Sequence, residues 1–171
     1  MTVNLATFVG LYDKQLTTLG HLLDKGAAFA AEQGVSEEDM LDWRLITDMQ
    51  PLSFQAAVVI NFAVQWPART AGLAEPMDVG MGVGLDVAGF KAAIAEARAW
   101  LAELPADLYA GREDLPLTYT IGTGMTLTLP NAQWITGFAT TNLYFHLSTA
   151  YAILRAKGVA IGKADLFAGG L

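Results

Sequence analysis

Apolar residues recur at steps of three and four over most of the chain, the spacing that places them on one face of an α-helix. Asp86 is typical of an N-cap and Gly158 of a helix stop, while Pro67 is predicted to kink the helix that contains it. A short acidic helix is expected after Ser36. The pattern predicts four long helices at about residues 5–34, 51–71, 87–104 and 131–157.

A different pattern occupies residues 117–129, where apolar residues alternate with threonines on both sides of Gly122-Thr123-Gly124. Period-two alternation around a glycine-flanked turn predicts a β-hairpin, and its apolar face should lie on the helices because an isolated hairpin is marginally stable. Residues 72–84 are rich in glycine and proline and predict an irregular loop, without the strand and lysine of a phosphate-binding loop. The expected architecture is one all-α domain, a four-helix bundle with a small β-hairpin between the third and fourth helices.

Composition and charge narrow the functional classes. Hydrophobic residues make up 53% of the 171 residues and the formal charge is -7, which excludes a disordered chain. An acidic chain without a basic patch is not expected to bind nucleic acid or an anionic membrane surface.

Residues 49–68 and 115–154 contain no Asp, Glu, Lys or Arg. Amides interrupt the first tract, and glycine and proline interrupt the second, so neither is predicted to span a membrane. Both tracts should instead be buried, against each other or against a second subunit. The first basic residue is Lys14, and no secretory signal is recognised at the start of this sequence, so a cytoplasmic location is expected.

The chain has no cysteine and two histidines, His21 and His146. This inventory excludes a disulfide framework, a thiol nucleophile, a cysteine zinc site and a three-histidine metal site. We therefore expect no metal and no cofactor.

His146 is the candidate catalytic residue because it lies on an apolar side of the last predicted helix. Gln55 lies within the apolar stripe of the second long helix, where an amide needs hydrogen-bond partners. Together with Asn142 and Thr149, these residues are predicted to line a mostly apolar ligand pocket in which the imidazole donates a hydrogen bond or acts as a general base. The alternative is a closed polar network that fixes helix register without a ligand.

Two further expectations concern charged and polar side chains outside this group. Asp48 and Arg155 are predicted to form a structural ion pair. His21 lies on the polar side of the first helix and is predicted to be a solvated surface residue.

Four segments of the sequence resemble those of a known protein family. The runs NLYFHLSTAYAILR (residues 142–155) and GVAIGKADLF (residues 158–167) resemble the C-terminal signature of an uncharacterised bacterial family, a domain of unknown function among the DinB/YfiT-like four-helix bundles. DMQPLSFQ (residues 48–55) and LLDKGAAFA (residues 22–30) are also similar to that family.

The resemblance implies a bundle, a frequent homodimer and a cleft at one end of the helices. In better-known DinB-like relatives that cleft holds a divalent metal on three histidines, and some are thiol-dependent transferases or metal-dependent hydrolases. Here only His146 matches, because Ala150 stands four residues later and the second long helix has no histidine. The relatives' metal chemistry is therefore not expected.

Three functions remain open from the sequence. The first is a metal-free homodimer that binds a small apolar molecule. The second is a divergent DinB-like enzyme, a transferase or isomerase, that uses His146 as acid or base. The third is a structural or interaction module without a ligand.

Overall fold

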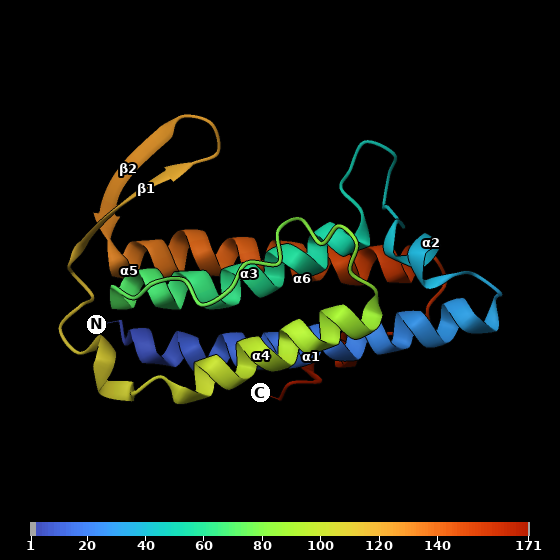
Figure 1. Ribbon diagram of the computed structural model, residues 1–171, viewed down its shortest axis with the longest axis horizontal. Helices are drawn as coiled ribbons and strands as arrows, with labels where there is room; N and C mark the ends of the chain where they lie inside the picture. The colour runs from blue at the N-terminus through green and yellow to red at the C-terminus, as the bar shows by residue number, and fades with distance from the viewer. Residues whose placement is uncertain (1–2, 171) are drawn as a thin grey trace.

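Four long helices form an elongated bundle in the computed structural model, which describes residues 3–170 (Figure 1). The second long helix ends at Gly72 in the left-handed conformation, and the last long helix is continuous with two shorter helical segments before it. The elements in chain order are α1 (Leu5–Glu32), α2 (Glu37–Leu41), α3 (Leu52–Ala71), α4 (Val87–Glu103), η1 (Ala106–Tyr109), β1 (Pro116–Ile121), β2 (Met125–Pro130), α5 (Asn131–Gln133), η2 (Trp134–Ala139), α6 (Thr140–Ala156) and η3 (Lys163–Phe167).

The predicted caps are confirmed. Asp86 accepts the Gly89 N–H at 2.7 Å at the start of α4, and Ser36 accepts the Asp39 N–H at 3.0 Å at the start of α2. The fold class is therefore as expected from the sequence, with the helices in the expected order.

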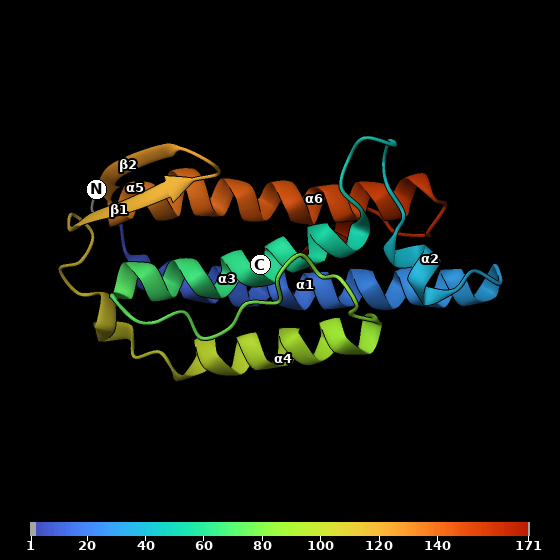
Figure 2. The ribbon, with the colours of Figure 1, turned by 45° about the horizontal axis from the view of Figure 1, so that its top comes forward.

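Helix α3 lies antiparallel to α6 (Figures 1 and 2). The buried side chains of α3 are largely alanine, valine and isoleucine. Alanines on α3 allow the two helices to approach closely, and Ile60 is fully buried among them. The first uncharged tract contains most of α3, and the second contains η2 and most of α6. The two tracts therefore pack mainly against each other.

One part of the last helix was not expected. Residues 134–139 form a π-helix, in which the Thr140 hydroxyl donates to the Ile135 carbonyl five residues earlier at 2.7 Å. The same hydroxyl lies 2.9 Å from the Tyr12 hydroxyl of α1. The wider turn therefore places Thr140 where it bonds across the bundle.

The hairpin pairs β1 with β2 in antiparallel register, with Leu117 opposite Leu129. Tyr119 of β1 packs against Trp66 of α3, with ring centroids 5.1 Å apart. Trp134 stacks on Trp66 and donates its indole N–H to the Leu117 carbonyl at 2.8 Å. The predicted contact of the hairpin with the helices is thus confirmed, since Tyr119 of β1 and Leu129 of β2 both pack against the core.

No helix within residues 3–170 is both long enough and apolar enough to cross a bilayer. The two uncharged tracts are accordingly used in the bundle and hairpin.

The packing between α3 and its neighbours should dominate stability. We expect Ile60→Ala to lower the free energy of unfolding by about 2–5 kcal/mol, because it leaves a cavity in the core. Ile46→Ala is the matched control, since Ile46 is 56% exposed and its truncation should change stability by less than about 0.5 kcal/mol. Urea unfolding followed by circular dichroism measures both, and equal effects would contradict the core assignment.

Candidate functional site

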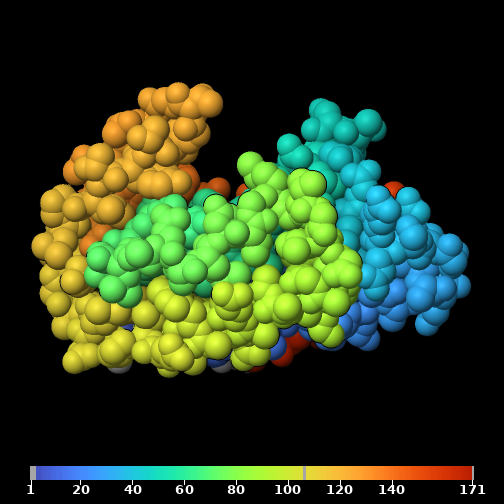
Figure 3. Space-filling model, viewed as in Figure 1, coloured from blue at the N-terminus to red at the C-terminus, as the bar shows by residue number. Residues whose placement is uncertain are grey.

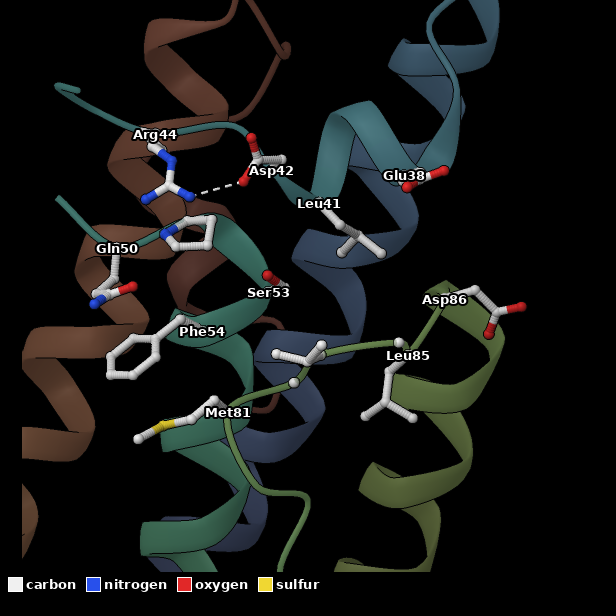
Figure 4. A pocket seen from close by; sticks show the side chains of 14 residues that line it. Glu38, Leu41, Asp42, Arg44, Gln50, Ser53, Phe54, Met81, Leu85 and Asp86 are labelled. Atoms are coloured by element: carbon white, nitrogen blue, oxygen red, sulfur yellow. Dashed lines mark hydrogen bonds and ion pairs between the residues drawn. The ribbon is translucent and has the colours of Figure 1, made fainter. Parts of the chain in front are cut away.

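A groove opens between α2, the first turn of α3 and the segment before α4, and we call it the end groove (Figure 4). Its volume is about 680 Å³. Its apolar lining comes from three separate parts of the chain: Leu41, Phe54, Met81, Val83 and Leu85. Leu41 is buried at the base, whereas Val83 is 89% exposed.

The segment that closes one side of the end groove depends on glycine. Gly82 has a φ of +72°, and a Cβ there would lie 2.7 Å from the Ser53 carbonyl oxygen and 2.9 Å from the Phe90 ring. Only glycine combines this backbone conformation with such a close approach. Gly82 therefore lets the loop lie directly on the first turn of α3.

Polar groups surround the apolar base. The Arg44 guanidinium donates to the Asp42 carboxylate and to the Met49 carbonyl, both at 2.8 Å. Arg44 is thereby held at one side of the groove, while Glu38 and Asp86 lie at the other side (Figure 4).

The sequence-predicted residues His146 and Gln55 meet next to this groove and not in its lining. His146 Nδ1 lies 2.7 Å from Gln55 Oε1, while Gln55 Nε2 donates to the Gln50 carbonyl at 3.1 Å. Because the Gln50 carbonyl requires the NH₂ group of Gln55, the amide oxygen faces the imidazole, and His146 Nδ1 must carry the hydrogen. In the neutral ring Nε2 is then the acceptor, and it has no protein partner among residues 3–170.

Two aromatic rings enclose the imidazole. Phe54 and Phe145 meet it edge to face, with centroids 5.8 and 5.1 Å away. Burial lowers the pKa of His146 below its ordinary value of 6.5, so the neutral ring is favoured near pH 7. Phe54 also lines the end groove, which separates the imidazole from the groove by one side chain.

The other two predicted ligand residues bond to their own helix. Asn142 donates to the Phe138 carbonyl at 2.7 Å, and Thr149 donates to the Phe145 carbonyl at 2.8 Å. The structure thus brings Gln55 to His146 and gives Asn142 and Thr149 local partners.

Two expectations for polar pairs need correction. Asp48 and Arg155 form no ion pair among the residues described, and the Arg155 guanidinium instead donates to the Val159 carbonyl at 3.1 Å. His21 is not simply solvated, because its Nε2 lies 2.6 Å from an Asp165 carboxylate oxygen. Both differences come from the segment that follows α6. This segment turns back at the end of α6, which brings the Val159 carbonyl to Arg155, and it then returns to α1, which brings Asp165 to His21.

The residues around His146 do not fit a divalent metal. Its Nδ1 is engaged by an amide, and its nearest ring neighbours are phenylalanines, which are not metal ligands. Within residues 3–170, no three His, Asp or Glu side chains gather closely enough to hold a metal ion.

The half-buried imidazole of His146 should make stability depend on pH. A histidine whose pKa is lowered by folding binds its proton more readily when unfolded, so stability is lost as the pH falls through 6.5. We expect the free energy of unfolding to decrease between about pH 8 and 5, and to decrease less in His146→Gln, which cannot titrate. The pKa of Asp165 is lowered by its bond to His21, so protonation of this carboxylate affects stability only at lower pH. Identical slopes in urea unfolding of both proteins would contradict the burial of His146.

Comparisons with known proteins agree with this architecture. The profile of a family described as "Domain of unknown function (DUF1993)" matches residues 6–167. No curated protein matches the chain. A solved structure of a DinB family member protein from Shewanella denitrificans is 28% identical, with a TM-score of 0.83, over 95% of this chain and 90% of that chain. The bundle is DinB-like, and the chain belongs to the DUF1993 family.

Proposed function

We propose that the chain is a metal-free protein that binds a small, largely apolar molecule in the end groove. The observation that carries the proposal is the groove itself. Its volume of about 680 Å³ is within the range of small-molecule sites, and its base is apolar.

The polar groups at the edge of the groove define what else the ligand should carry. The Ser53 hydroxyl and the Gln50 side-chain amide have no protein partner among residues 3–170, so both are free to bond to a ligand. Arg44 is already paired with Asp42. An apolar body with one neutral hydrogen-bonding group is therefore the chemistry that suits the site.

Filling the end groove should abolish binding. The uncharged dye Nile red is the probe, and its fluorescence reports transfer to an apolar environment. We expect Ser53→Trp to weaken Nile red binding at least tenfold, because an indole at this position occupies the groove. The matched control is Ala99→Trp on the exposed side of α4, which should bind as the unaltered protein does.

The outcomes of this experiment separate the candidate functions. Binding that is lost in Ser53→Trp and kept in Ala99→Trp supports the end groove. Equal binding by both variants places the dye elsewhere and contradicts the proposal. Failure of the unaltered protein to bind any Nile red favours a structural module without a ligand.

The second candidate function is an enzyme, a transferase or isomerase, in which His146 is the acid or base. The observation that favours it is the fixed neutral tautomer, which leaves Nε2 as an unshared acceptor of a proton. Phe54 contacts the imidazole and also lines the end groove, so a ligand in the groove would lie one side chain away from His146. The ¹⁵N chemical shift of His146 Nε2 tests this route: a change on adding Nile red favours the enzyme, and an unchanged shift favours simple binding.

A further inference from the structure

A second hollow lies between α1 and α4, and we call it the α1–α4 hollow. Its volume is about 430 Å³, within the range of small-molecule sites, and its lining shares no residue with that of the end groove. Leu16 and Ile94 form an apolar floor, since both side chains are buried. Gly20 of α1 and Ala95 of α4 also line the hollow, and their small size leaves it open.

An ion pair bounds each end of the α1–α4 hollow. The Arg98 guanidinium donates to the Asp13 carboxylate at 2.6 Å, and the Lys91 ammonium donates to the Asp24 carboxylate at 2.7 Å. The two helices are therefore antiparallel, and both pairs bridge them. Ala168, in the segment after α6, lines one side of the hollow. Figure 3 shows red atoms of this segment at the lower edge of the molecule, beside α4.

His21 lies between the two ion pairs on α1 and also lines the hollow. Its Nε2 lies 2.6 Å from one oxygen of Asp165, and the other oxygen of that carboxylate accepts the Gly162 N–H at 2.7 Å. The bond to His21 and the bond to Gly162 lower the pKa of Asp165, so this group is ionised near neutral pH and can only accept. Nε2 must then carry the hydrogen. In the neutral ring this leaves Nδ1 as an acceptor, without a protein partner among residues 3–170.

The Asp24–Lys91 pair keeps unused hydrogen-bonding capacity. Only Oδ1 of Asp24 is engaged, and Oδ2 has no partner within residues 3–170. An ammonium has three N–H groups, and Lys91 uses one of them for Asp24. The side chains of Lys91 and Asp24 are 50% and 55% exposed, so a ligand can reach both.

These groups are gathered at one end of the α1–α4 hollow. Asp24 follows His21 by three residues, so the two side chains are neighbours on one face of α1. N–H donors of a ligand match His21 Nδ1 and the Asp24 carboxylate, and an anionic group matches Lys91. An anion alone would face Asp24, and a cation alone would face Lys91. The complementary molecule is a zwitterion that lies against this ion pair with its charges reversed.

We infer that the α1–α4 hollow binds a free α-amino acid with an apolar side chain. Its ammonium donates to His21 Nδ1 and to the Asp24 carboxylate, and its carboxylate accepts from Lys91. Its side chain lies on the apolar floor of the hollow. The inference does not rest on a ligand in the end groove, because the two linings are separate.

Three related molecules test which groups of the ligand are recognised. L-leucine is the probe, and isothermal titration calorimetry at neutral pH measures its binding. N-acetyl-L-leucine lacks the ammonium and L-leucinamide lacks the carboxylate, while both keep the apolar side chain. We expect each to bind about tenfold more weakly than L-leucine, or weaker still, because each loses a charged hydrogen bond. The ¹⁵N chemical shift of His21 Nδ1 should change when L-leucine is added.

A pair of lysine variants tests the position of the site. Lys91→Gln should weaken L-leucine binding about tenfold or more, and it should leave the fold intact because Lys91 is half exposed. Lys157→Gln is the matched control, since Lys157 is an exposed lysine at the end of α6 and does not line the hollow. It should bind L-leucine as the unaltered protein does.

Selective binding of L-leucine that is weakened by Lys91→Gln and kept in Lys157→Gln supports the inference. Failure of the unaltered protein to bind L-leucine at millimolar concentration overturns it. Equal affinity for L-leucine and L-leucinamide, equal binding by the two variants, or an unchanged shift at His21 Nδ1 contradicts it as well.

Discussion

The packing of α3 against η2 and α6 is the interaction on which the rest of this structure depends. Two chain segments without charge meet there, and small side chains let their backbones approach closely. The stack of Trp66 on Trp134, with centroids 5.3 Å apart, fixes one end of the pair and supports the hairpin. The bond from His146 to Gln55 joins the same helices toward the other end. Both the hairpin and the end groove are thus positioned by one helix pair.

The histidine and the groove have separate roles in this arrangement. His146 is held by Gln55 and two phenylalanines, and it contacts the groove only through Phe54. The imidazole of His146 is paired with an amide, and the three-histidine metal set that the resemblance implies for other DinB-like bundles has no match in this chain, which has two histidines. The DinB-like fold therefore does not by itself assign a chemistry to this chain, which agrees with the general separation of fold from function.

Local sequence signals predicted the helices and the hairpin because each is encoded within a few residues. The N-caps at Ser36 and Asp86 follow from hydrogen bonds three residues away. The contact between Gln55 and His146 was also predictable, since both are polar groups on apolar helix faces and each needs a partner. Asp48 and Arg155 are exposed, and water can solvate both side chains. Neither residue therefore needs an ion-pair partner, and the sequence could not establish that they form one. The end groove was missed because its wall comes from three distant segments, although exposed apolar residues between glycines at positions 80–84 were a signal.

The central claim, that the ligand binds in the end groove and not beside His146, is tested most directly by soaking crystals with iodobenzene and locating iodine by its anomalous scattering. The account predicts an iodine peak in the end groove, in contact with Leu41, Phe54 or Leu85. A peak beside His146 Nε2, or iodine only in the hollow between the hairpin and η2, would contradict it.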